Sequence, residues 1–193
     1  MDDMTLQSLM TLFWPDADAD LGPGRQVHWL LDGARDPEIA SLVRSSGLDY
    51  TCLYSGALHP RLAAAAPYLV QLNPAAPATA RLLRRGWGQA WGIFTIGAAP
   101  ATLDRQRLHF KKFLRVQTAD GKLLAFRYYD PRVLNIYLPT CTSDEVRTLL
   151  GPVARLISES DAGTHALDFR LEGGAMTRRA VLLQEADHAH YPA

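Results

Sequence analysis

The hydrophobic pattern alternates between short apolar runs and stretches with one apolar side. The clearest run, VHWLLDGA at residues 27–34, predicts a strand buried on both faces. Asp36 and Pro37 then predict a helix start, since Asp offers an N-cap oxygen and Pro suits the first turn. Residues 49–56 are rich in β-formers and predict a second strand. This strand-helix-strand order predicts a parallel βαβ unit of two neighbouring strands.

The middle of the chain repeats this alternation. We expect helices over residues 60–66, 77–86 and 101–113, and strands over residues 68–72 and 91–96. The segment WGQAWG, residues 87–92, precedes the last of these strands. Its glycines allow Trp87 and Trp91 to pack into the core, and a ligand platform is the alternative interpretation.

The second half of the chain predicts antiparallel hairpins and two helices. An Asp-Gly turn separates residues 113–118 from 123–129, which should form a hairpin that extends the sheet. Further on, we expect helices over residues 131–138 and 143–150, a hairpin of residues 154–160 and 165–174, and a frayed tail at 185–193. Residues 178–184 continue the sheet or form a final helix.

Together these elements predict an α/β fold of the mixed α+β kind. A central mixed β-sheet begins with the parallel βαβ unit, is flanked by helices and ends in antiparallel hairpins. We divide the chain into an N-terminal extension (1–26), a main domain (27–158) and a short C-terminal extension (159–193) packed on the same domain.

Composition excludes several classes of protein. Lys plus Arg equals Asp plus Glu at 20 each, so no net field attracts nucleic acid or an anionic membrane, and we expect neither as a partner. No apolar stretch is long enough to span a membrane, and the acidic start does not fit a signal peptide, which predicts a cytoplasmic location. Cys52 and Cys141 are interpreted as buried thiols of a reducing compartment.

Catalytic motifs are absent from the sequence. There is no dinucleotide-binding glycine motif, phosphate-binding loop, nucleophile elbow or zinc-binding HExxH helix. Ser55 is interpreted as a turn hydroxyl, and Asp32 as a loop cap or a ligand-binding acid at the carboxyl edge of the sheet. The pair His188 and His190 is too weak a signal for a metal site. We therefore predict no catalytic residue, no metal and no cofactor.

The segment FRYYDPRVLNIYLPTCT, residues 126–142, raises the question of a functional site. Strand alternation would place Phe126 and Tyr128 on one face, with Arg127 and Tyr129 on the other.

Asp130 caps the following helix, Pro131 fixes its first turn, and Arg132 is expected to reach Asp32 or Asp36. The first interpretation is structural. Arg127, Asp130 and Arg132 would order this strand–helix junction, and Asp36 and Pro37 would order the earlier one. One alternative is partner binding through Arg127, Tyr129 and Arg132, in which an exposed Arg127 or Tyr129 would be a binding hot spot. The other alternative is catalysis.

Seven segments appear in an order that resembles a known family. WLLDGARDPEI, CLYSG, APYLVQL, WGIF, the pair FLRVQ and FRYYDPRVL, and LPTC together cover about residues 27–158. The resemblance is to the bacterial type VI secretion effector-chaperone or adaptor family, first described as a domain of unknown function. It implies a non-catalytic protein that binds a toxic effector in the producing cell and helps load it onto the valine-glycine repeat spike protein. The alternative function is a small hydrolase or transferase with a site around Asp32, Ser55 and Asp130.

Overall fold

The computed structural model describes residues 1–15, 24–99, 101–118 and 120–183. Seven strands form one sheet in which every neighbouring pair is antiparallel. In spatial order they are β2 (Tyr50–Cys52), β3 (Pro67–Leu72), β1 (Gln26–Asp32), β4 (Gly92–Gly97), β7 (Arg155–Glu159), β8 (His165–Glu172) and β9 (Ala175–Leu182). Two short strands, β5 (Arg115–Gln117) and β6 (Leu123–Ala125), form a separate hairpin.

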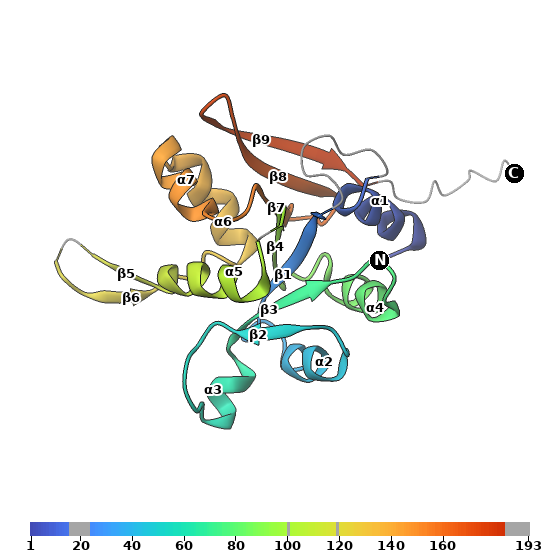
Figure 1. The fold of residues 1–193 in the computed structure, drawn as a ribbon, viewed down its shortest axis with the longest axis horizontal. Helices are drawn as coiled ribbons and strands as arrows, with labels where there is room; N and C mark the ends of the chain where they lie inside the picture. Colours follow the sequence, from blue (N-terminus) through green and yellow to red (C-terminus); the bar gives the residue numbers. More distant parts are fainter. Residues whose placement is uncertain (16–23, 100, 119, 184–193) are drawn as a thin grey trace, which may run out of the picture.

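Helices cover both faces of the sheet (Figure 1). One face packs against α1 (Asp3–Phe13), α2 (Ile39–Ser45) and α4 (Pro77–Gly86), and the other against α5 (Leu103–Phe110), α6 (Pro131–Tyr137) and α7 (Ser143–Leu150). The short helix α3 (Pro60–Ala64) connects β2 to β3, and the 3-10 turns η2 (Lys111–Phe113) and η3 (Leu138–Thr140) follow α5 and α6. The mixed α/β fold class predicted from the sequence is confirmed.

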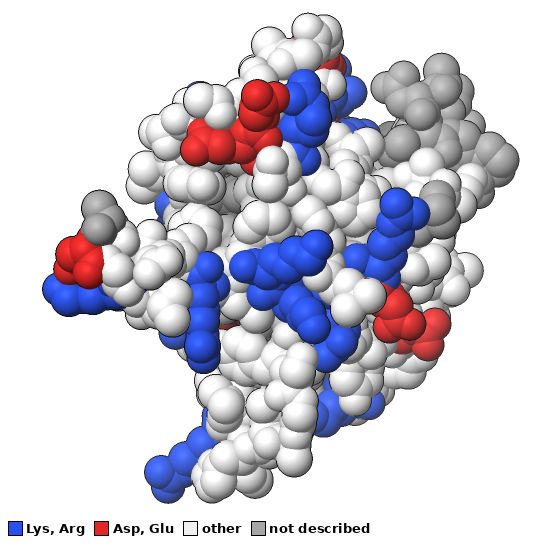
Figure 2. All heavy atoms as spheres, turned by 60° about the vertical axis from the view of Figure 1, so that its left-hand side comes forward, with Lys and Arg blue, Asp and Glu red and all other residues white. Residues whose placement is uncertain are grey.

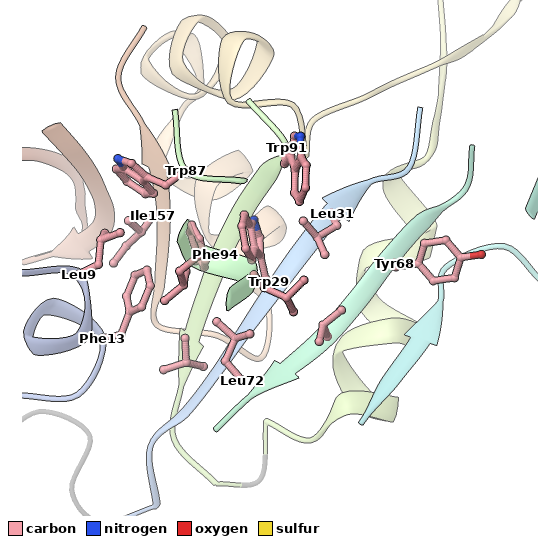
Figure 3. Packing of buried hydrophobic residues seen from close by; sticks show 14 of the residues in the cluster. Leu9, Phe13, Trp29, Leu31, Tyr68, Leu72, Trp87, Trp91, Phe94 and Ile157 are labelled. Carbon is pink, nitrogen blue, oxygen red and sulfur yellow. The ribbon is translucent and has the colours of Figure 1, made fainter. Parts of the chain in front are cut away.

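Strand β1 lies at the centre of the sheet and is buried on both faces. Trp29 and Leu31 point into the core under α1, α2 and α4, whereas Leu30 belongs to the core on the opposite face. Trp29 stacks on Phe94 of β4 with ring centroids 4.6 Å apart (Figure 3). The apolar run that predicted a doubly buried strand is therefore confirmed.

The two tryptophans of the WGQAWG segment are core residues. Trp87 is 6% exposed and Trp91 is 2% exposed, and both lie in the cluster around Trp29 and Phe94 (Figure 3). The indole Nε1 of Trp87 donates to the carbonyl of Gly163 at 2.7 Å. Core packing, and not a ligand platform, is the interpretation that the structure supports.

The predicted parallel βαβ unit is wrong in its pairing. Strands β1 and β2 run in the same direction but are not neighbours, because β3 lies between them and pairs with both. Strand β3 matches β1 over six residue pairs, while β2 spans only three residues and is partly exposed. The longer apolar strand therefore occupies the central position, and the short strand moves to the edge.

The first predicted hairpin forms, but it is shorter and does not join the main sheet. Its second strand ends at Ala125, so the alternation expected for residues 126–129 is absent. Both Tyr128 and Tyr129 are buried, and the Tyr128 hydroxyl donates to the carbonyl of Phe110 at 2.8 Å. Packing of these two aromatic rings against α5 and α6 ends the strand, since strand geometry would expose one of them.

Elements with strong local signals lie close to their predicted ranges. Thr142 and Glu145 form the predicted capping box, and α7 ends at Gly151, whose φ is +53°. The hairpin of β7 and β8 is confirmed, and β9 shows that the last apolar run continues the sheet instead of forming a helix. Helix α1 was not predicted, and residues 185–193, predicted as a frayed tail, lie outside the described residues.

Elements from both predicted extensions contact the main domain. Leu9 and Phe13 of α1 belong to the core cluster that contains Trp29, and β8 and β9 continue the sheet from β7. The division at residues 26 and 158 stays a prediction. Denaturation of an Asp168→Asn variant tests whether β8 and β9 unfold together with the other strands.

Candidate functional site

Asp32, the last residue of β1, lies in a buried polar environment. Its side chain is 1% exposed. One carboxylate oxygen accepts the backbone N–H of Ala34 at 3.0 Å, and the other lies 3.4 Å from the guanidinium of Arg127. Burial raises the pKa of Asp32, although the Ala34 N–H and the Arg127 charge act in the opposite direction.

Asp130 provides a second buried carboxylate beside the same end of β1. It is the N-cap of α6 and accepts the backbone N–H of Arg132 at 3.0 Å, with Pro131 in the first turn. The Arg132 side chain donates to the same carboxylate through Nε at 3.0 Å and through its terminal nitrogen at 2.5 Å. Burial raises the pKa of Asp130, but the hydrogen bonds from Arg132 outweigh it and the pKa is lowered.

Arg132 does not reach Asp32 or Asp36, contrary to the prediction from the sequence. Arg132 pairs with Asp130, and it is Arg127 that reaches Asp32. Both arginine side chains remain about half exposed, at 53% for Arg127 and 55% for Arg132. The expectation that Tyr129 is exposed was wrong, because Tyr129 is 3% exposed. Burial raises its pKa, and nearby Asp32 adds to this shift.

Asp36 and Pro37 lie in the turn before α2. The Asp36 carboxylate accepts the backbone N–H of Glu38 at 2.8 Å, but α2 begins only at Ile39, and the Glu38 side chain makes no cap. Asp36 therefore closes the turn that leads into the helix and is not the N-cap residue predicted from the sequence.

Glu159 is a third buried acid that the sequence interpretation missed. It ends β7, and its carboxylate accepts the backbone N–H groups of Gly88, at 2.6 Å, and Ala90. Ala90 has a φ of +52°, and Arg35 donates to the Ala90 carbonyl at 3.2 Å. Burial raises the pKa of Glu159. The signal that could have found it is an acid at the end of a strongly apolar strand.

A polar cavity of about 320 Å³ opens beside Glu159 and the first turn of α6. Arg35, Arg132 and Glu159 line it together with the loop around Ala90. We call Asp32, Asp130, Glu159 and their arginine partners the β1 junction. Each buried carboxylate in it accepts hydrogen bonds from a backbone N–H, and two also pair with an arginine, which is the arrangement of a well-compensated internal network.

Ser55 lies outside the β1 junction. Its hydroxyl accepts a hydrogen bond from Arg107 at 3.3 Å, and no histidine or carboxylate is bonded to it among the described residues. The structure therefore brings together Asp32 and Asp130, but Ser55, the third residue of the predicted hydrolase or transferase site, lies elsewhere. Within the described part of the chain, no three His, Cys, Asp or Glu side chains gather as a metal site would require.

A larger recess lies on the hairpin side of the molecule. It has a volume of about 620 Å³ and runs between the β2–α3 connection and the base of the β5–β6 hairpin. We call it the hairpin groove. Its apolar lining comes from Leu53, Leu58, Leu62, Leu114 and Ala125, and its cations are Lys111, Lys112 and Arg115.

Apolar side chains remain exposed on the hairpin whose base borders this groove. The hairpin extends away from the sheet (Figure 1) and leaves Val116 40%, Leu123 65% and Leu124 50% exposed. Leu62, on the opposite side of the groove, is 47% exposed. Grouped apolar side chains on a projecting element are typical of a surface that another protein covers.

The β1 junction predicts a clear difference between two single substitutions. Asp130→Ala should lower the free energy of unfolding by about 1–2 kcal/mol, because it removes the cap of α6 and leaves Arg132 without its partner. Arg132→Ala should cost less than about 1 kcal/mol, since the capped N–H belongs to the backbone and the guanidinium is half exposed. Urea denaturation of both variants measures the difference. An unchanged Asp130→Ala protein that no longer binds a partner would assign Asp130 to recognition instead.

Comparison with known proteins adds one finding. Residues 27–148, well over half of the chain, match the family described as "Domain of unknown function (DUF4123)". No curated protein and no solved structure matches the chain. None of the helices in the described residues is both long and apolar enough to cross a membrane. The match begins at the first residues of β1 and ends within α7, so it includes both sides of the hairpin groove and most of the β1 junction. The chain therefore belongs to the DUF4123 family.

Proposed function

We propose that this protein is a non-catalytic adaptor that acts in the cytoplasm of the producing bacterium. It binds an effector of the type VI secretion system and helps load it onto the valine-glycine repeat spike protein. The resemblance described above suggests this function. The observation that carries it is the exposed apolar surface around the hairpin groove, where Leu62, Leu123 and Leu124 are about half exposed or more.

The β1 junction supports a binding role more than a catalytic one. Its three carboxylates already accept hydrogen bonds from backbone N–H groups, so their lone pairs are largely occupied. Arg127 and Arg132 stay candidates for partner binding because about half of each side chain is exposed. Tyr129 is no longer a candidate for direct contact, because a partner cannot reach a side chain that is 3% exposed.

The alternative is a small hydrolase or transferase that uses Asp32 and Asp130. The raised pKa of buried Asp32 favours it, since catalytic acids often have shifted pKa values. Hydrolysis of ester or phosphoester substrates that is lost in Asp32→Asn, in protein that keeps its melting temperature, would establish this alternative.

A tagged pull-down from cells that express the secretion machinery tests the adaptor function. We expect one toxin-like protein to be recovered in stoichiometric amount, with or without the spike protein, and to rebind when both components are purified. A charge-matched bait with an unrelated fold controls for adhesion to the tag. Recovery of no specific partner from such cells would contradict the proposal.

A further inference from the structure

The cations of the hairpin groove have no acidic neighbours in the described part of the chain. Lys111, Lys112 and Arg115 line the groove, and none of them has a carboxylate within 4 Å among the described residues. No residue that lines the groove is acidic. Arg107, beside it, donates to the carbonyl of Cys52 at 2.8 Å, and it forms no ion pair with a carboxylate of the described residues. The groove therefore combines an apolar lining with uncompensated positive charge.

This positive charge is a local departure from a balanced chain. The whole sequence has equal numbers of acidic and basic residues, whereas residues 104–115 contain one acidic and five basic residues. That stretch runs along α5 and η2 to the first residue of β5, which ends at the groove. Figure 2 shows Lys and Arg side chains gathered over the middle of the hairpin side of the molecule, with acidic side chains toward its margins.

A ligand for this surface must satisfy both properties. Apolar side chains are needed to fill the space between Leu58, Leu62 and Leu114, and carboxylates are needed opposite Lys111 and Lys112. A flat membrane surface does not enter a recess, and the net charge of zero does not provide the broad basic footprint of a nucleic-acid-binding protein. An amphipathic protein segment with acidic residues flanking an apolar face fits both requirements.

We propose that the hairpin groove binds an acidic amphipathic segment of the effector, with apolar side chains against Leu58, Leu62 and Leu114 and carboxylates against Lys111, Lys112 and Arg115. This inference rests on the proposed adaptor function, because it names the effector as the owner of the segment. The apolar contacts supply most of the affinity, and the cations set the orientation and reject basic segments.

Two labelled synthetic peptides test the chemistry of the groove without knowledge of the effector. Each has about 14 residues, or four helical turns, with leucines on one face; the first carries glutamates elsewhere and the second carries lysines. Fluorescence anisotropy with the full chain should show the acidic peptide binding at least about tenfold more tightly than the basic one. Added salt should weaken the binding of the acidic peptide.

Paired variants locate the binding site. Lys111→Glu combined with Lys112→Glu should abolish or reverse the preference for the acidic peptide, and Leu62→Asp should weaken binding of both peptides. The matched controls are Arg178→Glu combined with Arg179→Glu, and Leu182→Asp, which change exposed residues of β9 that do not line the groove. These controls should bind like the unmodified protein. Circular dichroism melting confirms that each variant is folded.

Several outcomes would overturn the assignment. These are equal affinity for the two peptides, an equal effect of the β9 controls, stronger binding to vesicles containing phosphatidylserine than to the acidic peptide, or self-association that blocks the groove. The purified effector separates the two proposals. If it binds the groove variants and the unmodified protein equally, the adaptor function stands and the groove assignment is wrong. If the acidic peptide binds the groove but cells yield no effector, the groove still selects acidic amphipathic segments, but the effector is not its ligand and the adaptor function is wrong.

Discussion

Replacement of Asp168 by Asn is expected to lower the free energy of unfolding by about 3 kcal/mol or more. Asp168 lies in β8 and is 1% exposed. Its carboxylate accepts two hydrogen bonds from Arg155, at 3.1 and 2.7 Å, and one from Arg170 at 2.5 Å. Arg25 is also close enough to interact with it. The amide keeps the size of the side chain but leaves the largely buried guanidinium groups without their shared negative charge. Urea denaturation followed by circular dichroism measures the loss.

An exposed carboxylate serves as the matched control. Glu38 pairs with Arg85 at 2.9 Å, and both side chains are more than half exposed. Glu38→Gln should therefore change the free energy of unfolding by less than about 1 kcal/mol. Equal effects of the two substitutions would contradict the assignment of Asp168 as a buried anchor.

The same denaturation curve tests the division of the chain into domains. Asp168 belongs to the predicted C-terminal extension, and Arg155 belongs to the main domain. A single transition that shifts as a whole shows that β8 and β9 unfold together with the sheet. Two transitions, of which only one shifts, would show that residues 159–193 form a separate cooperative unit.

A second large effect is expected when pH falls. His28 in β1 is completely buried, and its Nδ1 lies 2.9 Å from Nε2 of Gln106, which also donates to the carbonyl of Ala101 at 2.8 Å. Nδ1 therefore accepts the hydrogen bond, and Nε2 carries the proton but has no hydrogen-bond partner within residues that the structure describes. Burial lowers the pKa of His28 from 6.5 to about 4, because a charged imidazole would be poorly solvated in the core.

The sign of this effect follows from proton linkage. Between pH 6.5 and about 4 the unfolded chain binds a proton at His28 that the folded chain does not bind. Stability due to this residue is complete above pH 6.5 and is lost as pH falls, up to about 3 kcal/mol. His28→Asn should remove this pH dependence, since its amide oxygen can replace Nδ1 as the acceptor. Free energies of unfolding at pH 7.5 and pH 4.5 provide the comparison.

A non-titrating change in the same network is the control. Thr95 donates to the Gln106 side chain at 2.6 Å, so Thr95→Val loosens the network without removing the imidazole. This variant should be less stable at both pH values and keep the pH dependence of the unmodified protein. If His28→Asn shows the same pH dependence as the unmodified protein, the buried imidazole is not its source.

The hydrogen bonds around His28 bear on the proposed binding surface. Gln106 lies on α5, which continues through η2 into the hairpin, so the bonds to His28 and Thr95 hold the element that carries Lys111 and Lys112. Tyr128 fixes the other end of the hairpin through its bond to Phe110. Because these bonds hold the base of the hairpin, the proposed binding surface needs little ordering when a partner binds.

Sequence by itself determined the elements whose signals are local. The apolar run of β1, the capping box of α7 and the Asp-Gly turn of the hairpin were each sufficient to predict their element. Each signal depends on residues that are only a few positions apart in the sequence. The caps around Asp130 follow the same logic. The sequence also contained the basic surplus of residues 104–115, but its importance depends on what lies opposite it in the fold.

Only the tertiary structure decided which strands are neighbours and which side chains meet. Strand β3 displaced β2 from β1 because pairing depends on length and burial over the whole sheet, which no local pattern records. Glu159 meets the Gly88–Ala90 loop across about 70 residues of sequence, and the hairpin groove joins Leu62 to Lys112 across about 50. Contacts of this kind arise when distant segments exclude water from a shared surface, so they appear only once the chain has folded.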